Sequence, residues 1–282
     1  MKPIPIAIDT DIGGDVDDAL ALGLVLESPE FDLRAITTVR GNVSARTQLT
    51  HELLGVYAKD SNPAIPVAAG ASEPLGENWH QAAEAAQPSP IGADAVNLLA
   101  WQIEKARSAK ERLTVVAIGS LTNIALLLAR HPELINAFDL VWMGGNWGGD
   151  RPKPEWNSLC DPEAAAVVFQ SGMMVKMVGL DVTRHCILSE EEVARFAQAS
   201  PRSRFLDTQI KKWGRRVVLH DPLTFLALIS PYVTFEPMRI EVPLTGDCRA
   251  WTVPVAGTPN TLVATRVDAE SAKKLFLDRV LR

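Results

Sequence analysis

Ten residues near the N-terminus, Asp9 to Asp18, hold five carboxylates directly after the short apolar run 4–8. Alternating isoleucines in that run predict a strand, Gly13 and Gly14 permit an unusual turn, and the apolar run 19–26 predicts a helix. Five clustered negative charges raise one another's pKa values unless a hard, oxygen-seeking cation such as Ca²⁺ or Mg²⁺ lies among them. The chain therefore begins with a strand–turn–helix unit whose acids lie where open α/β sheets bind ligands.

The alternation of strands and helices continues along the chain. Each later predicted strand ends in a turn that contains Gly, Asn, Asp or Thr. These strands are 33–39, 65–68, 113–118, 140–143 and 175–178. The pattern predicts an α/β fold with an open, mostly parallel sheet flanked by helices and an active site at the carboxyl ends of the strands. No linker, charge block or repeat interrupts it, so residues 1–282 are expected to form a single domain.

Composition excludes several classes of function. A net charge of −6 argues against a nucleic-acid binder. The chain lacks both a signal-like N-terminus and any run approaching the ~18 apolar residues of a membrane span, so a cytoplasmic protein is expected. Three widely spaced cysteines fit reduced thiols. One small basic cluster is interpreted as a solvated helix face: Lys211, Lys212, Arg215 and Arg216.

Two later segments repeat one pattern, an acid followed by proline and an apolar helix. In Asp161-Pro162 and Asp221-Pro222 the aspartate is placed to cap a helix whose first residues include the proline. Capping alone explains Asp161. For Asp221 a second interpretation stays open, because His220 precedes it and the N-terminal acids need further oxygen ligands from elsewhere in the fold.

Taken together, the short motifs of the chain resemble those of the inosine-uridine preferring nucleoside hydrolase family. The resemblance covers roughly residues 4–230. Its motifs are Asp9-Thr10-Asp11, Asp17-Asp18-Ala19, Gly41-Asn42, Gly119-Ser120-Leu121-Thr122-Asn123, Met143-Gly144-Gly145, Glu155-Trp156-Asn157, Asp161-Pro162-Glu163, Asp181-Val182-Thr183 and His220-Asp221-Pro222-Leu223.

The resemblance implies a nucleoside-hydrolase-like fold and the calcium-dependent hydrolysis of ribonucleosides to ribose and free base, by a homodimer or homotetramer. The ligands it implies for Ca²⁺ are the carboxylates of Asp11, Asp18 and Asp221 and the backbone carbonyl of Thr122. Asp11 is also the implied general base, and His220 is the residue implied to protonate the leaving base. The ribose contacts it implies are Asp17, Asn42, Glu155, Asn157 and again Asp221.

One departure from the family pattern concerns the first turn. Five residues separate Asp11 from Asp17, where most members have three, and the insertion adds Asp15. Either the turn bulges and keeps the same ligands, or Asp15 takes the role assigned to Asp17. Four tryptophans in or near the predicted site loops are candidates to stack on the nucleobase: Trp79, Trp147, Trp156 and Trp213.

Two alternatives belong to other classes. A haloacid-dehalogenase-like, Mg²⁺-dependent phosphatase also begins with Asp-x-Asp after its first strand, but it usually carries Thr or Val where this chain has Gly13. A non-catalytic nucleoside-binding protein would keep the fold and the metal without hydrolysis. Ribose release from nucleosides, measured with and without a chelator, separates all three.

Overall fold

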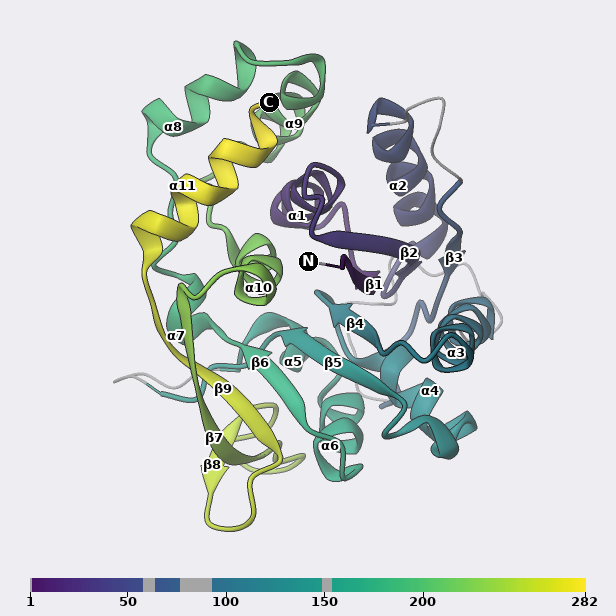
Figure 1. The fold of residues 1–282 in the computed structure, drawn as a ribbon. Helices are drawn as coiled ribbons and strands as arrows, with labels where there is room; N and C mark the ends of the chain where they lie inside the picture. Colours follow the sequence, from purple (N-terminus) through teal and green to yellow (C-terminus); the bar gives the residue numbers. More distant parts are fainter. Residues whose placement is uncertain (1, 58–63, 77–92, 149–153) are drawn as a thin grey trace.

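The computed structural model describes residues 2–57, 64–76, 93–148 and 154–282. Its strands form one nine-stranded sheet in the order β3-β2-β1-β4-β5-β6-β9-β7-β8 (Figure 1). The pairs from β3 through β9 are parallel, and β7 and β8 add an antiparallel edge. The predicted open, mostly parallel α/β sheet is therefore confirmed.

The strands are β1 (Ile4–Thr10), β2 (Phe31–Thr38), β3 (Val67–Ala69), β4 (Leu113–Ala117), β5 (Phe138–Met143), β6 (Val175–Val178), β7 (Val233–Glu241), β8 (Val253–Val255) and β9 (Thr261–Val267). The helices are α1 (Asp17–Leu26), α2 (Val43–Tyr57), α3 (Ala93–Ser108), α4 (Thr122–Arg130), α5 (Trp156–Cys160), α6 (Pro162–Gln170), α7 (Leu180–Thr183), α8 (Glu190–Ala194), α9 (Pro201–Trp213), α10 (His220–Ile229) and α11 (Ala269–Val280).

Both faces of the sheet are covered by helices. Along β1, Ile6 and Ile8 pack into a core shared with α1, α2, α9, α10 and α11, whereas Ala7 packs into a second core with α3, α4 and α6 (Figure 1). This alternation follows from the two-residue period of a strand. All three side chains are at most 1% exposed, as expected for a central parallel strand buried on both faces.

Polar side chains hold the carboxyl ends of the central strands together. Asn123 donates its side-chain N–H groups to Asp9 Oδ1 (2.8 Å) and to the carbonyl of Thr38 (3.1 Å), and it accepts from the backbone N–H of Ala71 (2.9 Å). Thr37 donates to the same Asp9 oxygen at 2.6 Å. Burial raises the pKa of Asp9 to about 7 despite these hydrogen bonds. The ends of β1 and β2 are thereby fixed against the start of α4.

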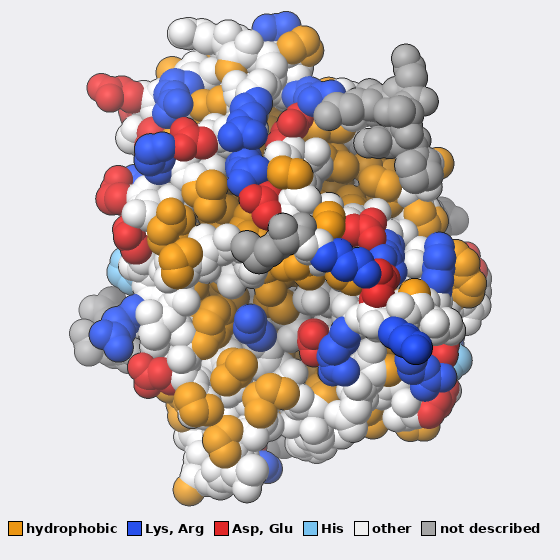
Figure 2. Space-filling view, viewed as in Figure 1, with side chains coloured by type: hydrophobic (Ala, Val, Ile, Leu, Met, Phe, Trp, Pro, Cys, Tyr) orange, Lys and Arg blue, Asp and Glu red, His pale blue; other side chains and the backbone are white. Residues whose placement is uncertain are grey.

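The surface drawn in Figure 2 carries charges of both signs. In Figure 2, basic and acidic side chains are interspersed over the face shown, and the described side chains form no continuous basic surface there. No helix in the described part of the chain is long and apolar enough to cross a membrane. The three cysteines are free thiols, as predicted.

Candidate active site

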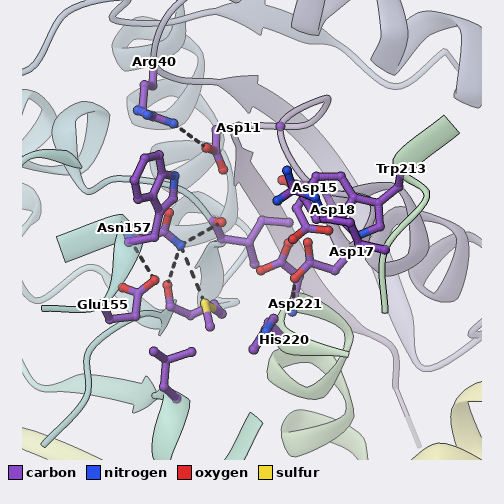
Figure 3. Close-up of a pocket in the computed structure, with 16 residues that line it drawn as sticks. Asp11, Asp15, Asp17, Asp18, Arg40, Glu155, Asn157, Trp213, His220 and Asp221 are labelled. Atoms are coloured by element: carbon purple, nitrogen blue, oxygen red, sulfur yellow. Dashed lines mark hydrogen bonds and ion pairs between the residues drawn. The ribbon is translucent and has the colours of Figure 1, made fainter. Parts of the chain in front are cut away.

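A cavity of about 450 Å³ lies at the carboxyl ends of the central strands (Figure 3). Its volume falls within the usual range of small-molecule sites. Its wall is unusually rich in acids, and it is formed by residues of β5, α1, α5, α7, α9 and α10 and of the segments that follow β1, β2, β4 and α9. The lining residues are Asp11, Gly14, Asp15, Asp17, Asp18, Arg40, Ile118, Met143, Glu155, Trp156, Asn157, Leu180, Trp213, Arg215, His220 and Asp221.

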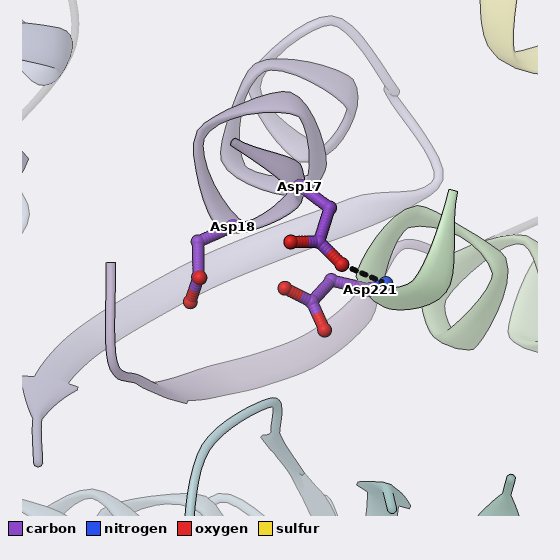
Figure 4. A group of neighbouring side chains, drawn as sticks. All are labelled: Asp17, Asp18 and Asp221. Atoms are coloured by element: carbon purple, nitrogen blue, oxygen red, sulfur yellow. Dashed lines mark hydrogen bonds between the residues drawn. The ribbon is translucent and has the colours of Figure 1, made fainter. Parts of the chain in front are cut away.

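Three buried carboxylates meet on one side of the cavity. Asp17 and Asp18 lie in the first turn of α1, and Asp221 reaches them from the first turn of α10 (Figure 4). One carboxylate oxygen from each lies within 4.8 Å of the others, and we call these residues the acidic triad. The backbone N–H of Asp221 donates to Asp17 Oδ2 (3.4 Å), and Thr10 donates its hydroxyl to Asp18 Oδ1 (2.5 Å).

The acidic triad is electrostatically unbalanced in the protein alone. Burial is the largest cause that raises the pKa values of Asp17, Asp18 and Asp221, and the neighbouring carboxylates raise them further. A hydrogen bond from Thr10 offsets only part of this at Asp18. Three hard oxygen donors within reach of one another, without enough positive charge to balance them, fit a divalent cation of the calcium or magnesium type.

Asp11 lies at the end of β1 and faces the same cavity, outside the acidic triad. The guanidinium of Arg40 lies 3.4 Å from Asp11 Oδ2 and 4.8 Å from the centre of the Trp156 ring. Arg46 donates hydrogen bonds to the backbone carbonyls of Asp11 and Ile12 and thereby fixes the start of the turn after β1. The carboxylate of Asp11 thus lies at the cavity wall, and two arginines, Arg40 from the β2–α2 loop and Arg46 from α2, fix the position of this residue.

Glu155 and Asn157 form the opposite wall (Figure 3). Glu155 caps α5 and accepts backbone N–H groups of Gly145, Asn157 and Ser158. Burial raises its pKa to about 7 against these three hydrogen bonds. Both side-chain N–H groups of Asn157 donate to backbone carbonyls, those of Ile118 (3.2 Å) and Met143 (3.1 Å). Its amide oxygen is therefore the group it can offer to a ligand hydroxyl.

His220 lines the cavity beside Asp221. Its Nδ1 lies 2.7 Å from the hydroxyl of Thr183, a residue of α7. Burial lowers the pKa of His220 to about 4. The imidazole is accordingly neutral near pH 7, held in place by Thr183, and positioned at the wall from which it could contact a departing group.

Comparison with known proteins identifies the family. Residues 6–274 match the family model described as inosine-uridine preferring nucleoside hydrolase. The chain belongs to this family. It is therefore a hydrolase that acts on N-glycosyl bonds, and the phosphatase alternative finds no support.

Several relatives of this nucleoside hydrolase match nearly all of its length. The pyrimidine-specific ribonucleoside hydrolase RihA of Klebsiella pneumoniae subsp. pneumoniae is 35% identical, over 98% of each chain. The non-specific ribonucleoside hydrolase RihC of Klebsiella pneumoniae is also 35% identical, over 96% of each chain. Among solved structures, an inosine-guanosine nucleoside hydrolase shows a TM-score of 0.82 at 26% identity over 98% of each chain. A purine-preferring ribonucleoside hydrolase from Gardnerella vaginalis gives 0.77 at 26%, again over 98% of each chain.

Most, but not all, of the predicted site residues of this nucleoside hydrolase lie together at the cavity. Asn42 is exposed, and its side chain accepts the backbone N–H of Ala45 (3.0 Å) at the start of α2. Thr122 is buried at the start of α4, where its hydroxyl donates to Asp161 (2.7 Å). Neither belongs to the residues lining the cavity. Their assignment to ribose and to metal stays a prediction.

The inserted turn places Asp15 and Asp17 differently. Asp17 is buried in the acidic triad, whereas Asp15 is exposed and lies at the edge of the cavity, where its carboxylate accepts the backbone N–H of Val16. The turn thus adds an acid at the rim and keeps the adjacent Asp17 and Asp18 together on α1. This arrangement favours the first of the two interpretations of the insertion.

Sequence reasoning missed two basic residues of the site. Arg40 follows β2 with a left-handed backbone (φ 69°) and lines the cavity. Arg215 was expected on a solvated helix face. It is exposed, but its place on a helix is wrong, because α9 ends at Trp213 and the left-handed Gly214 (φ 65°) precedes Arg215, which lines the cavity. The glycine directly before Arg215 was the only available signal of that helix end.

The tryptophans that were candidates to stack on the nucleobase differ in their position relative to the cavity. Trp156 and Trp213 line the cavity. Trp147 does not, since its indole N–H is directed at the carbonyl of Ala264 (3.4 Å). Trp79 lies outside the described residues.

Proposed function

We propose that this protein hydrolyses the N-glycosidic bond of ribonucleosides in a Ca²⁺-dependent reaction that yields ribose and the free base. The observation that carries the proposal is the acidic triad beside Asp11 in one cavity of about 450 Å³. A sugar whose anomeric carbon becomes positive during bond cleavage is stabilised by such a wall of carboxylates. The names of its ribonucleoside hydrolase relatives agree with this substrate class.

The donor set fits the metal. Ca²⁺ takes six to eight oxygen ligands, and the acidic triad supplies three carboxylates, with Asp11 and the Thr122 carbonyl as further proposed ligands. When bound, Ca²⁺ supplies charge neutralisation, orientation of sugar hydroxyls and a lowered pKa of the nucleophilic water. Mg²⁺ also binds oxygen ligands, so both ions are compared in reconstitution.

The protein's own residues then perform three tasks. Asp11 accepts a proton from the attacking water, with Arg40 fixing the orientation of its carboxylate at 3.4 Å. Glu155 and the amide oxygen of Asn157 hold ribose hydroxyls at the opposite wall, as do Asp17 and Asp221 from the acidic triad. The hydroxyls thereby fix C1′ of the sugar in front of the water, and bond cleavage takes place within a preorganised field of negative charge.

The test is release of reducing sugar from a panel of inosine, adenosine, uridine and cytidine and their 2′-deoxy counterparts. The purified protein is assayed as isolated, after exhaustive chelation, and after addition of Ca²⁺ or Mg²⁺, with metal content followed by elemental analysis. We expect turnover of ribonucleosides, loss of turnover on chelation and recovery with Ca²⁺. Undiminished activity in verified metal-free protein would remove the ion from the proposal, and no sugar release from any nucleoside would refute the activity itself.

A homodimer or homotetramer is part of the proposal as well. Light scattering of the protein at assay concentration measures this directly. A monomer with full turnover would contradict it.

A further inference from the structure

The carboxylate of Asp11 lies between a fixed cation of the protein and the proposed metal site. Figure 3 draws it with Arg40 on one side and the acidic triad on the other. Burial and then the charge of Asp11 are the two largest causes that raise the pKa of Asp18. Asp11 is nevertheless outside the group of carboxylates whose oxygens lie within 4.8 Å of one another. Its Oδ2 atom contacts the guanidinium of Arg40 at 3.4 Å instead.

The backbone of Arg40 is fixed independently of its side chain. The residue has a left-handed conformation (φ 69°), its N–H donates to the carbonyl of Ala71 (2.7 Å), and its carbonyl accepts the Nε–H of Arg46 (2.6 Å). None of these backbone contacts involves the guanidinium of Arg40. A substitution of this side chain therefore leaves the loop between β2 and α2 with the same backbone hydrogen bonds.

The guanidinium of Arg40 can release Asp11 without losing all of its partners. It lies 4.8 Å from the centre of the Trp156 ring, and the side chain of Arg40 is 21% exposed. Stacking on an indole and contact with water both stabilise a guanidinium. The contact with Asp11 is also longer than a charge-assisted hydrogen bond, which normally measures about 2.7–2.9 Å. The ion pair between Arg40 and Asp11 is therefore one that a divalent cation can replace.

We propose that Arg40 competes with the divalent cation for the carboxylate of Asp11 and thereby lowers the affinity of the site for Ca²⁺. This inference rests on the proposed function, in which Asp11 and the acidic triad bind the ion. An uncharged group that hydrogen-bonds a metal ligand usually strengthens a site, because it orients the ligand. Arg40 differs because it carries a full charge of the same sign as the ion, so it both offsets the charge of Asp11 and repels the ion.

The competition distributes charge differently in the two states of the protein. Without the ion, Arg40 balances the charge of Asp11, and the strongest repulsion is confined to the acidic triad. With the ion bound, Asp11 contributes its charge to the metal site, and the guanidinium of Arg40 keeps its contact with Trp156. The site therefore holds Ca²⁺ less tightly than its carboxylates alone would hold it.

The experiment measures the Kd of Ca²⁺ by isothermal titration calorimetry of chelator-treated protein, without substrate. Arg40→Ala and Arg40→Gln should bind Ca²⁺ roughly tenfold more tightly than wild type, near the lower end for one hydrogen bond to a charged group. Arg40→Lys, which keeps the charge, should stay within about threefold of wild type. The matched control, Arg216→Ala, removes an exposed arginine that does not line the cavity and should leave the Kd unchanged.

A double-mutant cycle with Asp11→Asn separates competition for Asp11 from a general effect of charge. The asparagine is uncharged, so Arg40→Ala in this background should tighten the binding of Ca²⁺ by less than about threefold. Thermal unfolding in chelator checks that each variant is folded.

Three results would overturn the inference. They are unchanged or weaker binding in Arg40→Ala and Arg40→Gln, equally tight binding in Arg40→Lys, and an equal gain from Arg40→Ala with and without the Asp11 carboxylate. If neither the wild type nor any variant binds Ca²⁺ or Mg²⁺, the metal-binding part of the proposed function has failed, and this inference fails with it.

Discussion

The charge imbalance of the acidic triad predicts an unusual response to Asp18→Asn. The carboxylate oxygens of the triad lie within 4.8 Å of one another. Two ionised carboxylates at that separation repel by roughly 3.5 kcal/mol at an effective dielectric constant of ~20. Neutralising Asp18 removes two such pairs. The asparagine amide would keep an oxygen to accept the hydroxyl hydrogen of Thr10, so the packing around it is preserved.

The metal-free wild-type protein takes up protons at these carboxylates, which relieves part of their repulsion. The stability gained by Asp18→Asn is therefore smaller than the sum of the two pair energies. The folded-state pKa values of Asp17, Asp18 and Asp221 are raised above the unfolded value of 3.8. Their contribution to stability is therefore present below about pH 4 and is lost as pH rises through the folded-state pKa values. We expect metal-free Asp18→Asn to be more stable than metal-free wild type at pH 8 by about 2–4 kcal/mol, and to differ less at pH 5.

The assay is thermal unfolding by calorimetry at pH 5 and pH 8, in chelator and in excess Ca²⁺. At ~2 °C per kcal/mol for a chain of this size, the variant should melt some 4–8 °C above wild type in chelator at pH 8. Ca²⁺ should raise the Tm of wild type strongly and that of the variant little, so that their order reverses. The control is Asp139→Asn, which neutralises an exposed carboxylate paired with Arg112 outside the cavity.

Two outcomes contradict the reasoning. A metal-free variant less stable than metal-free wild type at pH 8 would show that the triad is not under electrostatic strain. Equal stabilisation of both proteins by Ca²⁺ would show that Asp18 does not hold the ion. The Asp139→Asn protein should behave as wild type in both buffers.

Two further predictions concern the proposed chemistry. Asp11→Asn should stay folded and lose at least about 100-fold in kcat, the lower end for a missing general base, and a folded variant with kcat closer to wild type would remove Asp11 from that role. His220→Ala should slow ordinary nucleosides far more than a p-nitrophenyl riboside, whose leaving group needs no proton, if His220 protonates the base. Equal losses on both substrates would mean that His220, held by Thr183 at 2.7 Å, only positions its neighbour Asp221.

The local sequence was sufficient to predict the structure where a single short segment determines it. Alternating isoleucines, a glycine pair and an apolar run specify β1, the turn and α1, because strand and helix periods are local properties. The same segment places Asp11 at the end of β1, and Asp17 and Asp18 on the first turn of α1. Beyond residue 230 no motif was available, and β7, β8, β9 and α11 were not predicted.

The meeting of distant segments was decided only by the tertiary structure. Asp221 lies 204 residues from Asp17, and its two sequence interpretations, helix cap or partner of the acids, are separated only by how α10 packs against α1. Asn42 lies at the start of α2, where its side chain accepts the backbone N–H of Ala45, and its assignment to ribose stays a prediction. The sequence predicted Arg215 on a helix face, whereas in the structure α9 ends at Trp213 and Gly214 caps it. The direction of a side chain after a helix end depends on one backbone turn and on the packing around it, and no periodic pattern encodes either.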